Sequence, residues 1–147
     1  MDIPEPLRPL APDELELLHW MFEHGSDDLR SFLPQITGIR AARSCKCGCP
    51  SIRLEVAVDT PLGSDRGGRL VGDFEGKTAR GELVGVLLFQ KAGKLTELEV
   101  YSMDGQIQGE SSEFGLPVID SMNLLVWEAM PGKPNVWVAV KSPISPA

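Results

Sequence analysis

Cysteine and histidine are scarce in this chain of 147 residues, which has three cysteines and two histidines. All three cysteines lie between positions 45 and 49. An odd number of cysteines crowded into so short a segment argues against a disulfide framework, so we expect reduced thiols and a cytoplasmic setting. No apolar run approaches the ~20 residues of a membrane helix. The acidic, proline-rich segment 1–6 does not resemble a secretory signal. We therefore expect no association with a membrane.

Positive charge is also in deficit, with 14 Lys and Arg residues against 21 Asp and Glu residues and a net charge of −7. The charge is uneven, at −6 in residues 1–30, +4 in 40–94 and −5 in 95–147. This acidity argues against nonspecific binding to nucleic acid. It favours a basic protein partner, because an acidic surface steers the approach of basic proteins. Alternatively, the basic middle simply faces the acidic ends within one molecule.

Two helices are predicted near the N-terminus, after an extended lead-in over residues 1–11 that contains three prolines. The first covers 12–24, and its apolar residues fall on one wide stripe at helical spacing. These residues are Leu15, Leu17, Leu18, Met21 and Phe22. The second helix begins after Ser26, a good N-cap, and either stops near Leu33 or kinks at Pro34.

After residue 38 the apolar residues recur mostly at every second position, which is typical of strands. Strands are predicted at 39–44, 52–58, 69–75, 82–90 and 95–101, with a terminal hairpin formed by 124–128 and 136–141. Helices first and strands afterwards indicate an α+β fold. We expect two N-terminal helices packed on a mainly antiparallel, meander-like sheet of about five to six strands. Residues 1–147 form a single domain in this interpretation, and residues 142–147 are a frayed tail.

The cysteine cluster is the most concentrated chemical feature of the chain. In an extended strand, Cys45, Cys47 and Cys49 would point to one face, where thiolates can bind zinc. One residue between cysteines is a short spacing for ligands of one zinc ion, and a fourth ligand would have to come from His19, His24 or a carboxylate. The alternatives are thiol chemistry, or small residues at a tight turn with reduced thiols. The last interpretation is the one we favour.

Two groups of residues suit a protein-binding surface, in which aromatic side chains are enriched. The first group lies on the polar face of the predicted first helix, where Glu16 and Glu23 flank Trp20. The second group lies on one face of the strand 95–101 and consists of Glu97, Glu99 and Tyr101. Carboxylates on strands can instead serve acid–base chemistry. That alternative requires carboxylates among Asp73, Glu75, Glu97 or Glu99 to converge in a pocket.

Several segments resemble a group of small uncharacterised bacterial α+β proteins. They are Leu7–Leu10 before the acidic helix, the Cys47–Ile52 turn, Gly93–Ser102 and Leu116–Met122. The segment Glu97–Tyr101 is the most specific of them. The group implies an α+β domain and carries no established activity. Short acidic proteins of this kind are also similar to the immunity proteins of bacterial toxin systems.

The sequence therefore leads to three hypotheses, one of which is the small enzyme with sheet carboxylates described above. The first is a non-enzymatic, acidic protein-binding module, immunity-like in character, because no catalytic constellation is recognisable. The alternative is a metal-binding protein that uses Cys45, Cys47 and Cys49, with zinc as the metal.

Overall fold

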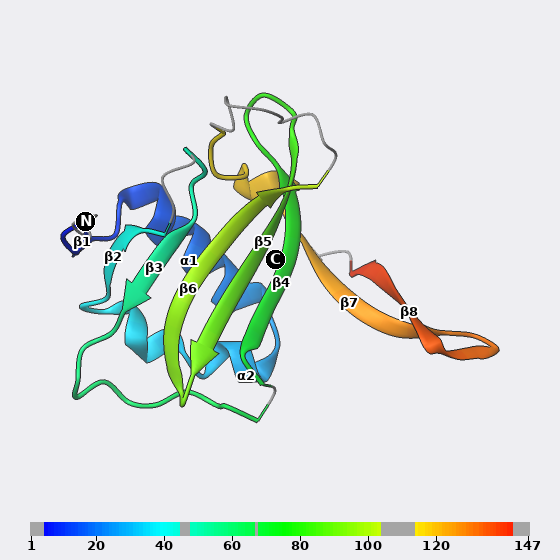
Figure 1. Cartoon of the computed structure of the whole chain (residues 1–147), viewed down its shortest axis with the longest axis horizontal. Coiled ribbons are helices and arrows are strands. Elements are labelled where there is room, and N and C mark those ends of the chain that lie inside the picture. Colours follow the sequence, from blue (N-terminus) through cyan, green and yellow to red (C-terminus); the bar gives the residue numbers. More distant parts are fainter. Residues whose placement is uncertain (1–4, 45–47, 67, 104–113, 143–147) are drawn as a thin grey trace, which may run out of the picture.

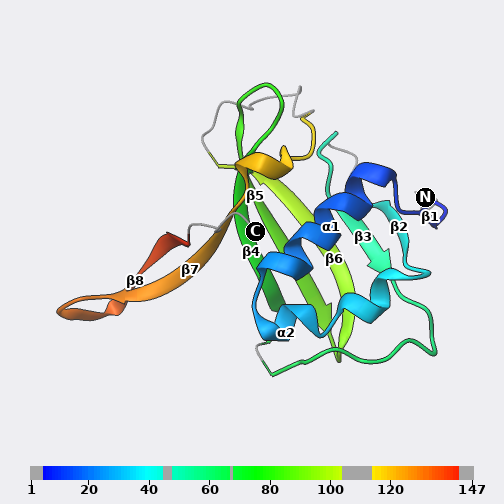
Figure 2. The same ribbon diagram turned by 180° about the vertical axis from the view of Figure 1, so that it is seen from behind.

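The computed structural model describes residues 5–44, 48–66, 68–103 and 114–142. Figures 1 and 2 show helices on one side of a single twisted sheet. In chain order the elements are β1 (Arg8–Pro9), α1 (Pro12–His24), α2 (Asp27–Arg30), the 3₁₀ helix η1 (Leu33–Ile36), β2 (Arg40–Arg43), β3 (Ile52–Glu55), β4 (Leu70–Lys77), β5 (Leu83–Lys91), β6 (Lys94–Ser102), the 3₁₀ helix η2 (Ile119–Ser121), β7 (Asn123–Met130) and β8 (Lys133–Ser142).

The described strands form one sheet in the order β1-β2-β3-β6-β5-β4-β7-β8, and every recorded strand pair is antiparallel. The predicted α+β class is confirmed, but the predicted strand number is too low. Seven strands have four residues or more, and β1 adds a pair of residues. The strand that was not predicted is β1, which contains Pro9. Proline is tolerated there because β1 lies at the edge of the sheet.

The predicted meander holds locally but not across the whole sheet. Strands β1 to β3, β4 to β6, and β7 to β8 are each joined in sequence order, but β3 neighbours β6 and β4 neighbours β7. The chain after β3 must therefore cross the lower end of β6 and β5 before β4 begins, and the described residues 56–66 follow this path in Figure 1. Ser142, expected to begin the frayed tail, is the last residue of β8, and residues 143–147 lie outside the described part.

Helix α1 lies against one face of the sheet (Figure 2), and the apolar residues of its inner side are buried. Leu17, Leu18, Met21 and Phe22 are buried, whereas Leu15 is 36% exposed, so the buried stripe is narrower than predicted. Proline at the first helical position and two acidic residues in the first turn favour the start of this helix. The helix is not long and apolar enough to cross a membrane, and neither is any other helix among the described residues.

The predicted second helix is short because of its proline. The Ser26 hydroxyl accepts a hydrogen bond from the Leu29 N–H at 3.2 Å and caps α2 as expected. The α-helix ends at Arg30, and the chain continues as the 3₁₀ helix η1, which contains Pro34. Proline removes one N–H donor and clashes with the preceding helical turn, so a longer α-helix is excluded.

The core lies between the helices and the covered face of the sheet. Alternate residues of each central strand point into it, as the two-residue period of a strand requires. Fully buried members are Phe22, Phe32, Phe74, Val84, Val86, Leu88, Leu95 and Leu98. At 25 cal/mol per Å² of apolar area removed from water, each large side chain contributes roughly 1.5–3 kcal/mol.

A buried glutamine connects the helical layer to the turn between β5 and β6. Gln35 is fully buried. Its Nε2 donates to the carbonyls of Gly93 at 2.6 Å and Pro61 at 3.0 Å, and its Oε1 accepts from the Leu95 N–H at 3.0 Å. One side chain thus fixes η1, the crossing segment and the start of β6. The turn itself is tight, with positive φ at Ala92 and Gly93, as a type I′ turn requires.

We expect Gln35→Leu to lower the free energy of unfolding by about 2–4 kcal/mol, because it leaves the buried Leu95 N–H without an acceptor. Urea denaturation measures this change. Thr37→Ala, at an exposed position nearby, is the control and should change stability by less than about 0.5 kcal/mol. A Gln35→Leu variant as stable as the wild type would contradict this role of Gln35.

Candidate functional site

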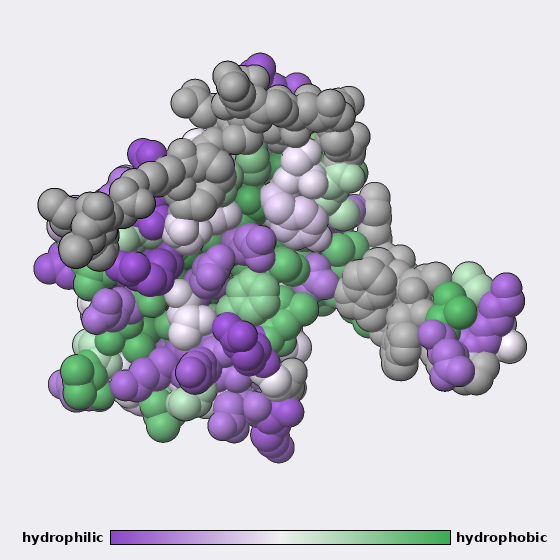
Figure 3. All heavy atoms as spheres, in the orientation of Figure 1, coloured by the Kyte–Doolittle hydropathy of each residue, from purple (hydrophilic) through white to green (hydrophobic). Residues whose placement is uncertain are grey.

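Strand β5 carries apolar side chains on both of its faces, but helices cover only one of these faces. Val84, Val86 and Leu88 are fully buried beneath the helices. Leu83, Leu87 and Phe89 alternate with them, face the other way and are half-buried. Figure 3 shows that this uncovered side carries hydrophobic surface between hydrophilic groups. A sheet face of this kind usually points polar side chains to water, so these apolar residues make the uncovered face a candidate binding surface.

Carboxylates lie on both sides of this apolar stripe. On β4, Asp73 is opposite Leu87. On β6, Glu99 is opposite Leu87 and Glu97 is opposite Phe89. Glu75, further along β4, is buried. We call this surface the acidic open face. It consists of Asp73, Glu75, Leu83, Leu87, Phe89, Glu97, Glu99 and Tyr101.

Tyr101 lies flat over the strand next to its own. It pairs with Gly85 of β5, and a Cβ atom at Gly85 would overlap the tyrosine ring. Glycine is therefore required at position 85 for the ring to occupy this place. Burial raises the pKa of the Tyr101 phenol, and the negative charges of Asp73, Glu99 and Glu75 raise it further. The phenol hydroxyl, which is protonated at neutral pH even at its ordinary pKa of 10.0, can donate a hydrogen bond to a partner.

Glu97 experiences a similar environment. Burial raises the pKa of its carboxyl group, the negative charge of Glu99 raises it further, and Arg69 opposes the shift. Arg53 of β3 is the cross-strand neighbour of Glu97. The net effect is that the ionised form of Glu97 is less stable in the folded protein than in water. A positive group placed on the acidic open face would relieve that repulsion.

The two groups of predicted binding residues lie on opposite sides of the sheet. Glu97, Glu99 and Tyr101 belong to the acidic open face, whereas α1 covers the other face (Figure 2). Glu16 and Glu23 are exposed on α1. Trp20 is partly buried, because its ring stacks on His24 at 4.4 Å and meets the ring of Phe74 edge-on at 5.5 Å. Trp20 therefore supports the core, and the helix residues do not extend the sheet surface.

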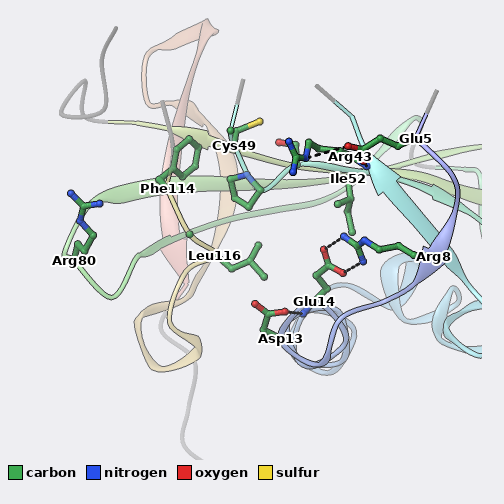
Figure 4. A pocket seen from close by; sticks show the side chains of 14 residues that line it. Glu5, Arg8, Asp13, Glu14, Arg43, Cys49, Ile52, Arg80, Phe114 and Leu116 are labelled. Carbon is green, nitrogen blue, oxygen red and sulfur yellow. Dashed lines mark hydrogen bonds and ion pairs between the residues drawn. The ribbon is translucent and has the colours of Figure 1, made fainter. Parts of the chain in front are cut away.

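Cys49 lines a cleft of about 640 Å³ at the opposite end of α1 from His24. In Figure 4, Cys49 lies across this cleft from Asp13 and Glu14. The carboxylate of Glu14 accepts two hydrogen bonds from Arg8, at 2.7 and 2.9 Å, and one from the Ala11 N–H at 2.7 Å. These contacts saturate the carboxylate and close the first turn of α1.

The described residues supply no cluster of further ligands for a zinc ion bound by the cysteines. No group of three His, Cys, Asp or Glu residues among them could hold a metal ion. His24 lies about 15 Å along the helix axis from Glu14, and its Nδ1 is 2.8 Å from the Trp20 carbonyl oxygen. Cys45 and Cys47 lie outside the described residues, so the predicted zinc site stays a prediction.

Sequence reasoning missed two parts of the site. The apolar run from Leu83 to Phe89 lies in the strand predicted at 82–90, but the exposure of its alternate residues on the uncovered face was not predicted. The glycine at position 85 beside a possible aromatic neighbour was the available signal. The Arg8–Glu14 pair was also missed. Its signal was a glutamate three residues after Ala11, in the position where a side chain reaches back to the N-cap.

Comparisons with protein-family models, with curated proteins and with solved structures found no match. The resemblance to small bacterial proteins and to immunity proteins therefore stays a prediction.

Glu97→Gln should stabilise the protein at neutral pH by less than about 1 kcal/mol, because the carboxylate is partly screened by solvent. Its raised pKa means that the folded state holds the proton more tightly than the unfolded chain does. The wild type therefore loses stability as the pH rises from the ordinary value near 4.5 through the raised pKa, and the variant does not. Thermal unfolding against pH measures the difference, with the exposed Glu16→Gln as control. A loss of stability in Glu97→Gln at pH 7 would contradict the electrostatic account.

Glu14→Gln should have the opposite effect. Burial raises the pKa of Glu14, but the hydrogen bonds from Arg8 and the Ala11 N–H, together with the charge of Arg8, outweigh burial and lower it. The ionised carboxylate therefore stabilises the fold above the ordinary pKa, and this contribution is lost as the pH falls through the lowered value. We expect a cost of about 1–3 kcal/mol at pH 7. The cost should shrink in acid, and a cost that does not change with pH would contradict this assignment.

Proposed function

We propose that this protein is a non-enzymatic protein-binding module that holds a basic partner on its acidic open face. The observation that carries the proposal is the arrangement on three adjacent strands. Half-buried Leu83, Leu87 and Phe89 run along the middle, and carboxylates of β4 and β6 flank them. Apolar area supplies the attraction, and the carboxylates select for positive charge.

The electrostatics of this face support a cationic partner. Asp73, Glu75 and Glu99 raise the pKa of Tyr101, and Glu99 raises that of Glu97, so like charges already repel one another here. An arginine or lysine of a partner would reduce this repulsion and stack on the tyrosine ring. The net charge of −7 would also accelerate the approach of a basic protein.

A protein is a better occupant of this face than a small substrate. The face follows the length of β5, a strand of nine residues, which spans about 30 Å at 3.3 Å per residue. Small substrates bind in concave pockets that enclose most of their surface. Of the four carboxylates considered for catalysis, Asp73 alone lines the groove beside β4. The catalytic hypothesis therefore has no geometric support from this groove.

More specifically, we propose that this binding module is an inhibitor of the immunity type. Such a protein would cover a basic surface of a toxin, for example the nucleic-acid-binding surface of a nuclease. The acidic open face presents negative charge at spacings set by neighbouring strands, as a nucleic-acid mimic would.

The test is affinity capture from a lysate of the source cell, followed by binding measurements with each purified captured protein. Glu97→Gln/Glu99→Gln removes two charges from the acidic open face. Glu16→Gln/Glu23→Gln removes the same charge from α1 and is the matched control. We expect a basic protein to be retained by the wild type and by the control, and the face variant to bind it at least about tenfold more weakly, equal to 1.4 kcal/mol.

Added salt should weaken the wild-type complex, because screening reduces the attraction between the charged surfaces. Equal retention by the face variant and the wild type would refute the assigned surface. Failure of the wild type to retain any basic protein would refute the proposed function.

A further inference from the structure

The cleft of about 640 Å³ beside Cys49 is rich in arginine for so acidic a chain. Three of the 14 residues that line this Cys49 cleft are arginines, namely Arg8, Arg43 and Arg80. In Figure 4, Arg8 and Arg43 lie on one side of the cleft and Arg80 lies on the other. None of the lining residues belongs to the acidic open face, so a ligand held here would be separate from the proposed protein partner.

Apolar side chains lie between the arginines. Phe114 and Leu116 are partly buried, pack against the hydrophobic core and occupy the middle of the cleft in Figure 4. Ile52, which also lines the cleft, is buried. A cleft of several hundred Å³ with an apolar lining and a few charged groups has the size and character of a small-molecule site.

Hydrogen bonds fix the wall of the cleft that carries Arg43. The buried Ser51 hydroxyl donates to the carbonyl of Val100 at 3.1 Å and accepts from its N–H at 2.9 Å. The carbonyl of Ser51 accepts from the Ser44 N–H at 3.2 Å, next to Arg43. The start of β3 and the end of β2 are therefore held together at the rim of the cleft.

The opposite wall is fixed by the turn between β4 and β5, which carries Arg80. The buried Thr78 hydroxyl accepts hydrogen bonds from the N–H groups of Arg80 at 3.3 Å and Glu82 at 3.2 Å. Thr78 also pairs with Pro117 in an antiparallel bridge, which connects this turn to the segment that carries Phe114. The walls are thus in place before a ligand arrives, so binding loses less conformational entropy.

The three arginines differ in how strongly they are engaged within the described part of the chain. Arg8 uses both of its Nη atoms in the bidentate ion pair described above. Arg43 Nε is 3.7 Å from the carboxylate of Glu5, and Arg80 Nε is 4.0 Å from that of Glu82. Such long ion pairs between exposed side chains are weak. A guanidinium has five N–H donors, so these contacts leave Arg43 and Arg80 able to bind an anion.

Carboxylates also line the cleft, but each of them has a donor. Glu14 is saturated by Arg8, Glu5 accepts from the Arg43 N–H at 3.3 Å, and Asp13 accepts from the Glu14 N–H at 2.9 Å. These interactions reduce the negative potential that an incoming anion meets.

We propose that the Cys49 cleft binds a small dicarboxylate. Its apolar middle lies against Phe114 and Leu116, and its two carboxylates meet Arg43 on one side and Arg80 on the other. A guanidinium matches a planar carboxylate with paired hydrogen bonds, which favours this head group. Two cationic groups on opposite sides of an apolar lining favour a ligand with an anionic group at each end and select against one with a single charge.

Isothermal titration calorimetry tests this with unbranched dicarboxylates of about four to ten carbons. The affinity should pass through a maximum at the length that spans the two arginines, with a dissociation constant of about 1 mM or lower. The monocarboxylate of that length meets one arginine only and should bind at least about tenfold more weakly. Equal affinity of the two acids, or an affinity that only rises with chain length, would overturn the proposal.

Arg43→Gln and Arg80→Gln each remove one of the two cationic groups. Each variant should bind the dicarboxylate about as weakly as it binds the monocarboxylate. Arg30→Gln and Arg66→Gln are matched controls, because their side chains are 53% and 87% exposed against 54% and 79% for the cleft arginines. The controls should retain the preference for the dicarboxylate. Retention of that preference in both cleft variants, shown to be folded by circular dichroism, would refute the assigned arginines.

Methyl NMR of the wild type locates the ligand and does not depend on any variant. The methyl signals of Ile52 and Leu116 should shift when the best dicarboxylate is added, whereas those of Leu83 and Leu87 on the acidic open face should remain in place. Shifts confined to residues outside the cleft would overturn the site, as would the absence of binding up to about 10 mM of every dicarboxylate. Either result leaves the proposed protein-binding face to its own test.

Discussion

The structure depends on a single layer of helices that covers one face of the sheet. The central strand β5 carries apolar residues on both its covered face and its uncovered face. Val84, Val86 and Leu88 bury one side of β5 beneath α1 and are fully shielded from water. Leu83, Leu87 and Phe89 are left on the other side and are half-buried. An antiparallel sheet with one uncovered face more often alternates polar residues on that face. The uncovered apolar stripe is therefore the feature on which the proposed binding function rests.

The charges around this stripe lower stability, and the same repulsion would favour the proposed binding of a basic partner. Neighbouring carboxylates raise the pKa of Glu97 and of the Tyr101 phenol, so the unbound protein retains like-charge repulsion on one face. At the other carboxylate site, Glu14, paired donors lower the pKa and the charge stabilises the start of α1. Glu97 on the sheet is thus destabilised by its surroundings, whereas Glu14 in the helix turn is stabilised by paired donors.

Much of the fold could be predicted from the local pattern of the sequence. Leu98 and Val100 alternate with Glu97, Glu99 and Tyr101, and this two-residue period assigned the faces of β6 correctly. The strand order could not be predicted, because pairing of β3 with β6 depends on contacts between distant segments. Local periodicity also could not show that Trp20, predicted at the edge of the polar face of the helix, packs against the core. Its ring packs on Phe74, which is 54 positions further along the chain.

The most direct test of the binding face is a methyl NMR titration of the captured basic partner into leucine-labelled protein. The account predicts that the methyl signals of Leu83 and Leu87 shift on binding, whereas those of Leu17 and Leu18, buried beneath α1, remain in place. Shifts confined to residues near α1 or the Cys49 cleft, with Leu83 and Leu87 unchanged, would contradict it.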